Sequence, residues 1–333
     1  MPYAHSSNVW NSTLATLHPG GVPIHASTSS FMARVLDGKG ATPQRNYLGT
    51  DTTQSTLPVY NVDSTTPLQW MRIGDSWRYG NDSSVDGSYQ VNQDVQVPIP
   101  VGLVKPPGYS DYQVILYNVD TGDEWNIWHT GLNLAQTLYN GLDGSGCWIP
   151  TDVGSGTMRY TCQSAGLYRV NGSDNTPGVG GFIVGGTLPA KTPKAWGTRG
   201  AKVPLGIGLV RKWEVDQGAI HHAIAWAYHG PGPEYVAPAQ NSDGGNFGGV
   251  SGLDLPEGAR IRLNPTFDLT RFPAGTARIV GRALQDYGAV LIDNSGFPKA
   301  YLESNNTAAW TDVSPGMMSA AALSDYQVID WTV

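Results

Sequence analysis

The sequence is poor in charged residues. Only 14% of its 333 residues are Asp, Glu, Lys or Arg, and the formal net charge is −7. A nucleic-acid-binding protein needs a basic face to neutralise phosphates, so nucleic acid is not an expected partner. The chain also has no polybasic stretch and no run of 18 apolar residues, so we expect no membrane insertion.

The sequence shows no secretory signal and few cysteines. No basic N-terminal region followed by an apolar run is present, which is the pattern of a signal peptide. We therefore expect a protein that reaches the outside of a cell by lysis or as part of a particle. The two cysteines, Cys147 and Cys162, cannot fix the redox compartment, and whether they form a disulfide stays open.

Common catalytic motifs are missing as well. There is no Gly-x-Ser-x-Gly elbow, no P-loop and no His-Glu-x-x-His sequence. The adjacent pair His221 and His222 would point to opposite faces of a strand, so the two rings cannot chelate one ion. The sequence predicts neither a metal site nor a cofactor.

Turn-forming and aromatic residues are abundant instead. The chain contains 42 Gly and 23 Pro, which indicates many short strands joined by turns and a mainly β fold. It also contains 11 Trp and 16 Tyr. An aromatic, weakly charged surface is typical of proteins that bind carbohydrate, whereas the alternative is that these rings fill a large β-sandwich core.

The local patterns divide the chain into two parts. Residues 1–75 are rich in Ser and Thr and predict an extended N-terminal arm or lobe, and residues 76–333 predict the β-sandwich domain. The segment "YQVILYNVDTGDEWNIWH" predicts a β-hairpin. The following elements are predicted towards the C-terminus: a helical turn over 212–216, a strand over 220–228, one helix at about 275–288 and a second hairpin joining 289–293 to 298–304.

The predicted strand "GAIHHAIAWAY" has two different faces. Ile220, His222, Ile224, Trp226 and Tyr228 share the bulky face, and three alanines share the other face with His221. His222 is either a hydrogen-bonded core histidine or the floor of a pocket lined by Trp226 and Tyr228. The C-terminal helix is a candidate partner for the small-residue face.

The predicted hairpin presents a carboxylate beside aromatic rings. Glu124 and Trp128 share one face, and Trp125 and His129 share the other. A ring beside Glu124 suits sugar recognition or general acid chemistry, and the alternative is a solvated Glu at a hairpin tip. Candidate carbohydrate-binding residues are Trp125, Trp128, His129, Trp226, Tyr228 and Tyr235, and candidate catalytic residues are Glu124 and His222.

Four stretches occur in an order that resembles a known family. They are "VPIPVGLVKPPGYSDYQVILYNVDTGDEWNIWH", "VPLGIGLVRKWEVDQGAIHHAIAWAY", "LPEGARIRLNPTFDL" and "RALQDYGAVLIDNSG", within about residues 95–300. The resemblance is to a family shared by secreted actinobacterial proteins and minor tail proteins of actinobacteriophages. It implies a carbohydrate-associated, jelly-roll-like antiparallel β-sandwich. The family usually has Asp–His where this chain has His221–His222, so any catalytic role of that Asp is absent here.

These observations lead to one expected function and its alternatives. We expect a minor tail or host-recognition protein in the tail of a virion, binding actinobacterial cell-surface polysaccharide and contacting other virion proteins as a homo-oligomer. The first alternative is a glycoside hydrolase or lyase on the same sandwich, and the second is a purely structural virion protein. For location, the alternative is an extracellular protein without a secretory signal peptide.

Overall fold

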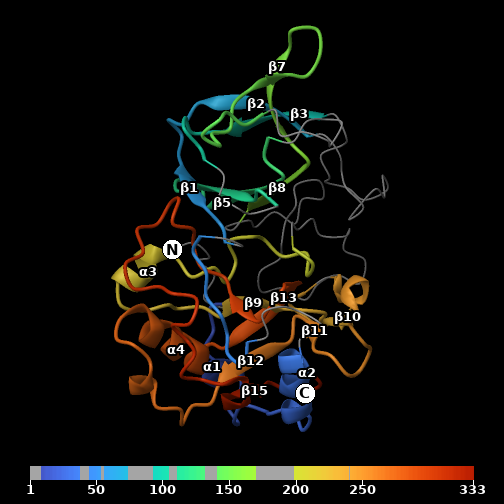
Figure 1. Ribbon diagram of the computed structural model, residues 1–333, viewed down its shortest axis with the longest axis vertical. Coiled ribbons are helices and arrows are strands. Elements are labelled where there is room, and N and C mark those ends of the chain that lie inside the picture. The colour runs from blue at the N-terminus through green and yellow to red at the C-terminus, as the bar shows by residue number, and fades with distance from the viewer. Residues whose placement is uncertain are drawn as a thin grey trace.

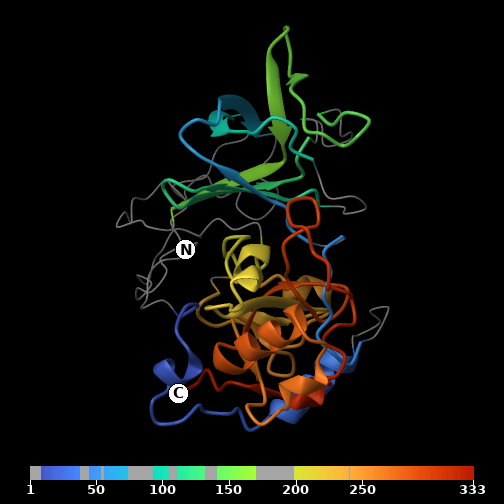
Figure 2. The ribbon, with the colours of Figure 1, turned by 90° about the vertical axis from the view of Figure 1, so that its left-hand side faces the viewer.

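Strands dominate the structure, as the composition predicts, and they lie in two lobes (Figure 1). The computed structural model describes residues 9–37, 45–53, 56–73, 93–104, 111–131, 141–169, 199–239 and 241–333. We call the described residues from 56 to 169 the sandwich lobe and all other described residues the mixed lobe. The two lobes follow one another along the long axis of the molecule (Figure 2).

Two four-stranded sheets face each other in the sandwich lobe. Their strand orders are β1-β4-β5-β8 and β3-β2-β7-β6. The strands are β1 (Val59–Val62), β2 (Leu68–Ile73), β3 (Gln93–Pro98), β4 (Val114–Asn118), β5 (Asp123–Trp128), β6 (Thr151–Asp152), β7 (Met158–Cys162) and β8 (Ser164–Arg169). Inward side chains from both sheets, such as Leu116 and Met71, share one buried cluster, so each sheet buries one face against the other.

Strand directions in these sheets differ from the predicted arrangement. The predicted hairpin is confirmed, because β4 and β5 pair antiparallel with Leu116 opposite Trp125. The jelly-roll order is not confirmed, because β1 pairs in parallel with β4 and β2 pairs in parallel with β7. A jelly roll is built from antiparallel strands. The fold is therefore mainly β with mixed sheets.

The segment before residue 75 belongs to both lobes. Its strands β1 and β2 pair with strands on the other side of the expected boundary. It also forms α1 (Leu14–Leu17) and α2 (Thr28–Asp37), neither of which was predicted. The serines of "STSSFMARVLD" are typical of a loop, but Phe31, Met32 and Val35 line one face of α2 and are buried.

A five-stranded sheet is the centre of the mixed lobe. Its order is β14-β9-β13-β12-β15, and the strands are β9 (Ile224–Tyr228), β12 (Arg260–Leu263), β13 (Ala289–Asn294), β14 (Lys299–Ala300) and β15 (Tyr326–Val328). The predicted second hairpin is wrong. Strand β9 lies between β13, its parallel partner, and β14, its antiparallel partner. A short parallel pair, β10 (Gly232–Tyr235) and β11 (Pro256–Glu257), lies beside this sheet.

Two of the predicted helical segments are confirmed. Helix α4 (Thr276–Asp286) occupies the predicted range, and Gly288 follows its C-cap with a φ of 74°. Helix α3 (Lys212–Asp216) is the predicted helical turn. Three short 3-10 helices complete the described elements: η2 (Gly244–Phe247), η3 (Leu269–Arg271) and η4 (Leu323–Asp325). No helix in the described ranges is long and apolar enough to cross a membrane.

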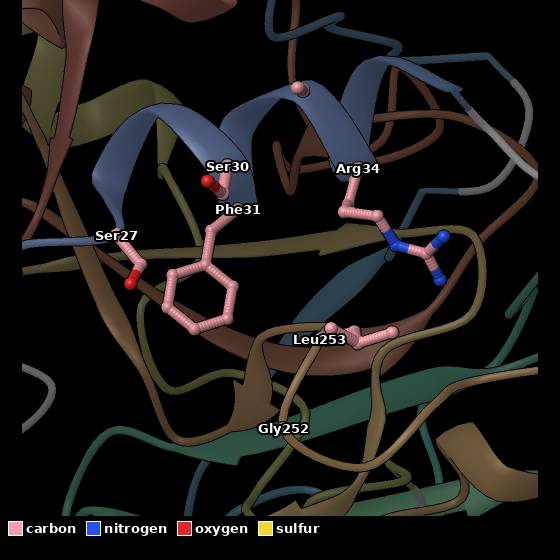
Figure 3. A pocket seen from close by; sticks show the side chains of 7 residues that line it. Ser27, Ser30, Phe31, Arg34, Gly252 and Leu253 are labelled. Atoms are coloured by element: carbon pink, nitrogen blue, oxygen red, sulfur yellow. The ribbon is translucent and has the colours of Figure 1, made fainter.

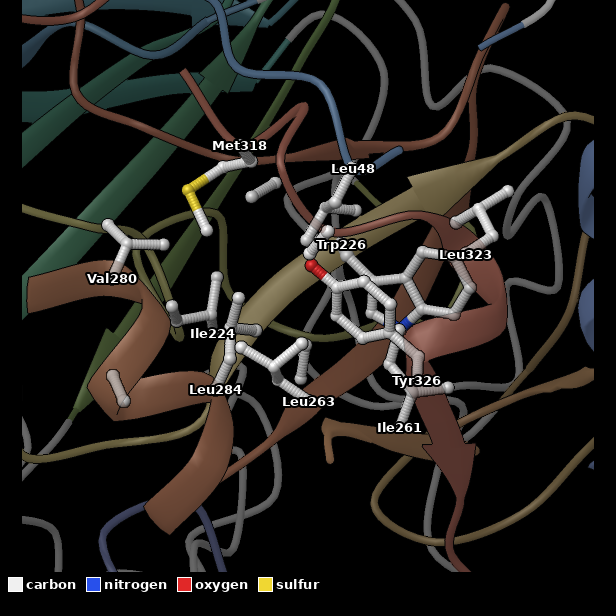
Figure 4. Close-up of a cluster of buried hydrophobic side chains, with 14 of the residues drawn as sticks. Leu48, Ile224, Trp226, Ile261, Leu263, Val280, Leu284, Met318, Leu323 and Tyr326 are labelled. Atoms are coloured by element: carbon white, nitrogen blue, oxygen red, sulfur yellow. The ribbon is translucent and has the colours of Figure 1, made fainter. Parts of the chain in front are cut away.

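Strand β9 is buried on both faces. Ile224, Trp226 and Tyr228 share a cluster with residues of α2 and α4 (Figure 4). The alanines of the opposite face pack against the segment 201–209 and against Val59 of the sandwich lobe. Helix α4 therefore covers the bulky face of β9, not the small-residue face for which it was the expected partner.

Candidate functional site

The two candidate catalytic residues are both buried in hydrogen-bond networks. The Glu124 carboxylate accepts hydrogen bonds from the Asn126 amide at 2.5 Å and from the Gly206 backbone N–H at 2.8 Å. Only 1% of the residue is exposed, so it is neither a solvated hairpin tip nor a group presented to a sugar. The hydrogen bond from Gly206 links the sandwich lobe to the segment 201–209.

His222 is a core histidine in a second network. Its Nε2 lies 3.1 Å from a Glu214 carboxylate oxygen, and its Nδ1 lies 2.9 Å from the Ala223 carbonyl oxygen. Burial alone would lower the pKa of His222, but the neighbouring Glu214 carboxylate outweighs it and raises that pKa. His222 and Glu124 therefore serve separate structural networks and do not form an acid–base pair.

Three of the six predicted sugar-binding residues lie in the core. Trp226 and Tyr228 have no exposed surface, and their rings stack on each other with centroids 5.5 Å apart. Trp125 lies in the sandwich core. These three assignments are wrong because alternation along a strand defines its faces but does not tell which face another element covers.

Trp128 and His129 are only partly buried. Their ring centroids are 4.4 Å apart, and burial lowers the pKa of His129. Tyr235 differs from all the other candidates, because 53% of it is exposed. It lies on β10, with Glu257 of β11 as its neighbour across the strand pair.

A groove lies beside helix α2, and its loop wall is joined to β10, the strand that carries this exposed tyrosine, by a hydrogen bond between Ser251 and Glu234. Its volume is about 500 Å³, which is within the ~300–1,000 Å³ typical of ligand pockets. Figure 3 shows the helix on one wall and the 252–253 loop on the other. The lining residues are Ser27, Ser30, Phe31, Ala33, Arg34, Gly252 and Leu253. The groove thus combines serine hydroxyls with apolar carbon.

The cation in the groove wall is matched by a buried anion. Arg34 donates from Nε and Nη2 to the two carboxylate oxygens of Asp254, at 3.1 and 2.9 Å. Asp254 also accepts the Val250 backbone N–H at 2.7 Å. This two-point contact fixes the guanidinium and holds the 250–254 turn against α2. The wall therefore carries no net charge from this pair.

Three more exposed side chains lie on β10, on η2 and on the 250–254 turn, which belongs to the groove loop. We call the groove together with Tyr235, Phe247 and Val250 the groove surface. Each of these three side chains and Leu253 is at least 39% exposed. A hydrogen bond from Ser251 to Glu234 joins the loop to β10. The groove surface therefore offers hydroxyl groups, a phenol and apolar carbon in one region.

Two buried carboxyl groups, those of Asp243 and Glu257, form a pair next to strands β10 and β11. Asp243 precedes η2 and Glu257 belongs to β11, and a Cβ built on Gly200 would approach oxygens of both at 2.7 Å. Burial, followed by the charge of Asp293, raises the pKa of Asp243 to about 7. Burial, followed by the charges of Asp243 and Asp293, raises the pKa of Glu257 well above its usual range.

Cations and a phenol complete this carboxyl cluster. Asp293 accepts from Arg199 Nη1 at 3.2 Å and from the Tyr301 hydroxyl at 3.3 Å. The Arg199 guanidinium lies over the Tyr301 ring, 3.8 Å from its centroid. Burial, followed by the nearby charge of Arg199, lowers the pKa of Lys299 to about 8. Strongly shifted groups of this kind gather at functional sites more often than elsewhere.

The described residues give no metal centre and no disulfide. No group of three or more His, Cys, Asp or Glu side chains among them could hold a metal ion. Cys147 and Cys162 are both free thiols. Burial raises the pKa of the Cys162 thiol far above its usual range, so this group is an unreactive part of the core.

Neither the groove nor the carboxyl cluster was predicted from the sequence. Ser27 and Ser30 lie in the segment that was expected to be an arm, so nothing in the sequence indicated that they meet at the start of α2, with Ser27 just before the helix and Ser30 within it. Asp293 had a usable signal, since it ends the apolar run "AVLI" and a carboxylate there must be partnered. No sequence feature near Asp293 indicates that it lies close to Asp243 and Glu257 in the fold.

Comparison with known proteins adds no identification. No protein family, no curated protein and no solved structure matches this chain.

Proposed function

We propose that this protein binds cell-surface carbohydrate through the groove surface. The observation that carries the proposal is the groove of about 500 Å³ with Ser27 and Ser30 on one wall and Leu253 on the other. A sugar unit carries hydroxyl groups at its edge and C–H groups on its faces, and this wall offers a partner for each. Tyr235, exposed nearby, supplies a ring on which a second sugar unit can stack.

We further propose that the protein is a host-recognition component of an actinobacteriophage tail. The ordered motifs of about residues 95–300 support this part of the proposal. Repeated copies on one particle would convert weak single-site binding into high avidity. A shallow, uncharged binding surface is sufficient for such a role. Detection of the protein in purified tails, by antibody labelling, tests this part directly.

Cleavage of the bound glycan is the second candidate function. The carboxyl pair Asp243 and Glu257 supplies the two groups that glycoside hydrolysis needs, one as a proton donor and one as a base or nucleophile, but Asp243 is 7% exposed and Glu257 0% exposed, so a sugar reaches them only if the residues that cover them move apart. Glu257 is also the cross-strand neighbour of the exposed Tyr235. This candidate replaces the Glu124 and His222 pair expected from the sequence.

Binding is tested by titration calorimetry with purified arabinogalactan and capsular polysaccharide from an actinobacterial host. We expect the wild-type protein to bind, and Ser30→Trp, which fills the groove, to weaken binding at least tenfold. Tyr235→Ala should also weaken it. Ser29→Trp is the matched control, since Ser29 is an exposed neighbour on the same helix that does not line the groove.

The same mixtures separate the three functions. New reducing ends that disappear in Glu257→Gln, with an unchanged thermal melt, would establish the enzyme. Binding without release supports recognition alone. If neither polysaccharide binds, or if Ser30→Trp binds as well as Ser29→Trp, the groove is not a glycan site and a purely structural virion protein is the better description.

A further inference from the structure

The outer face of sheet β3-β2-β7-β6 carries an exposed tryptophan. Alternation along β2 sends Met71 and Ile73 into the sandwich core and therefore sends Leu68, Trp70 and Arg72 outward. Leu68 is 59% exposed and Trp70 is 45% exposed. Leu68 and Trp70 are neighbours on this outer face, and exposed apolar side chains that adjoin one another can mark a binding site.

The Trp70 ring is held in place from a neighbouring strand. The Arg159 guanidinium of β7 lies 5.4 Å from its ring centroid, which is within the range of a cation–π contact. Arg159 is itself fixed, because Nε donates to Asp94 at 3.0 Å and Nη1 donates to the Met158 carbonyl at 2.8 Å. A ring that is positioned before binding loses little conformational entropy when a ligand stacks on it.

Positive charge exceeds negative charge beside this ring. Asp94 accepts hydrogen bonds from Arg72 as well as from Arg159. The hydrogen bond from Arg72 outweighs partial burial and lowers the pKa of Asp94, so this carboxylate is ionised at neutral pH. Two guanidinium groups share one carboxylate, which leaves one unit of positive charge on a chain whose net charge is −7.

Part of each guanidinium remains available for a ligand. Nη1 of Arg72 and Nη2 of Arg159 have no hydrogen-bond partner among the described residues. About one fifth of each arginine side chain is exposed. Guanidinium groups pair with carboxylate and phosphate more strongly than with neutral acceptors.

We propose that this outer face, formed by Leu68, Trp70, Arg72, Asp94 and Arg159, is a second carbohydrate site that selects acidic polysaccharide. We call it the Trp70 face. The indole stacks on the C–H face of a sugar ring, and the arginines pair with a carboxylate or phosphate on the same or the next sugar. The site is separate from the groove surface, so the failure of one proposal leaves the other intact.

The test uses two forms of one polymer. Polygalacturonic acid carries a carboxylate on each sugar, and its highly methyl-esterified form has the same backbone without most of the charge. By affinity electrophoresis we expect the acidic form to retard the protein and the esterified form to do so at least tenfold less. A phosphomannan, run in parallel, shows whether phosphate can replace carboxylate.

Variants connect the binding to named side chains. Trp70→Ala and Arg159→Gln should each weaken retardation by polygalacturonic acid at least tenfold, while Trp70→Phe retains part of it. Val119→Ala, an exposed apolar position at the hairpin turn, is the matched control, and Ser30→Trp should have no effect because it lies in the groove.

This inference would be overturned by a lack of retardation by both acidic polymers, by equal retardation by the methyl-esterified form, or by undiminished retardation of Trp70→Ala. Binding of single-stranded DNA at the same strength would also overturn it, since that would indicate unselective attraction of anions. Thermal melts of each variant confirm that a loss of binding is not a loss of fold.

Discussion

At the residue scale, a few buried ionisable side chains make the stability of the protein depend on pH. Asp243 and Glu257 approach each other around Gly200, where no side chain can be added. His222 is hydrogen-bonded to Glu214. Burial lowers the pKa of the imidazole, but the Glu214 carboxylate raises it by more, so the net shift of the pKa is upward. Each of these groups prefers its protonated form in the folded state, so each contributes stability that is lost as pH rises.

The unfolding free energy should fall between about pH 4 and pH 7. Burial raises the pKa of Asp243 to about 7, so in this window the folded chain keeps a proton that the unfolded chain releases. Asp243→Asn removes this linkage and should flatten the decline by roughly 4 kcal/mol. Urea denaturation at several pH values measures the slope. An unchanged slope in Asp243→Asn would show that another group carries the linkage.

At the element scale, the segment 201–209 connects the two lobes. It packs against the alanine face of β9, and its N–H groups bind Glu124 and Asn126 of β5. Gly208 has a φ of 68°, and its carbonyl accepts the Ala225 N–H at 2.8 Å. This close approach needs a residue without a side chain.

Gly208→Ala should therefore destabilise the protein by about 3 kcal/mol. A Cβ at this position would lie 2.6 Å from the Ala225 nitrogen and 2.7 Å from the Trp10 ring, so crowding is added to backbone strain. Gly218→Ala is the control, because Gly218 has a φ of 85° with open space around it, and strain alone should cost about 1 kcal/mol. Equal losses of stability in the two variants would contradict the packing argument.

At the scale of the whole molecule, one apolar cluster crosses between the lobes. Val59 and Ile115 come from the sandwich lobe, and they share this cluster with the alanines of β9 and with Tyr301. The polar contacts of Glu124 cross the same junction. Separating the lobes would expose both, so neither lobe is expected to unfold alone.

A single cooperative unfolding transition is the expected consequence. Calorimetry should show one peak, and tryptophan fluorescence should follow far-ultraviolet circular dichroism. Ile115→Ala should lower the midpoint of the entire transition, because it removes apolar contact from the shared cluster at a cost of about 2–5 kcal/mol. Two separate transitions, or a shift in only one of them, would show that the lobes are independent.

The two carbohydrate proposals also belong to this scale. The groove surface lies in the mixed lobe and the Trp70 face lies in the sandwich lobe, so one chain would bring two different sugar chemistries to one cell surface. The groove carries no net charge from Arg34 and Asp254, whereas the Trp70 face carries an excess of one positive charge. A heteropolymer with neutral and acidic sugars fits both.

The sequence by itself determined the features that depend on residues close together in the chain. Alternation defined the 112–129 hairpin and the faces of β9, and the apolar stripe with a terminal glycine defined α4. Partners distant in the chain decided the rest, because burial depends on which element covers a face. Trp226 and Trp70 both lie on strands, yet Trp226 is enclosed in the core shared with α2 and α4, whereas Trp70 stays exposed beside Arg159. Only the tertiary structure distinguishes a ring that fills the core from a ring that can meet a ligand.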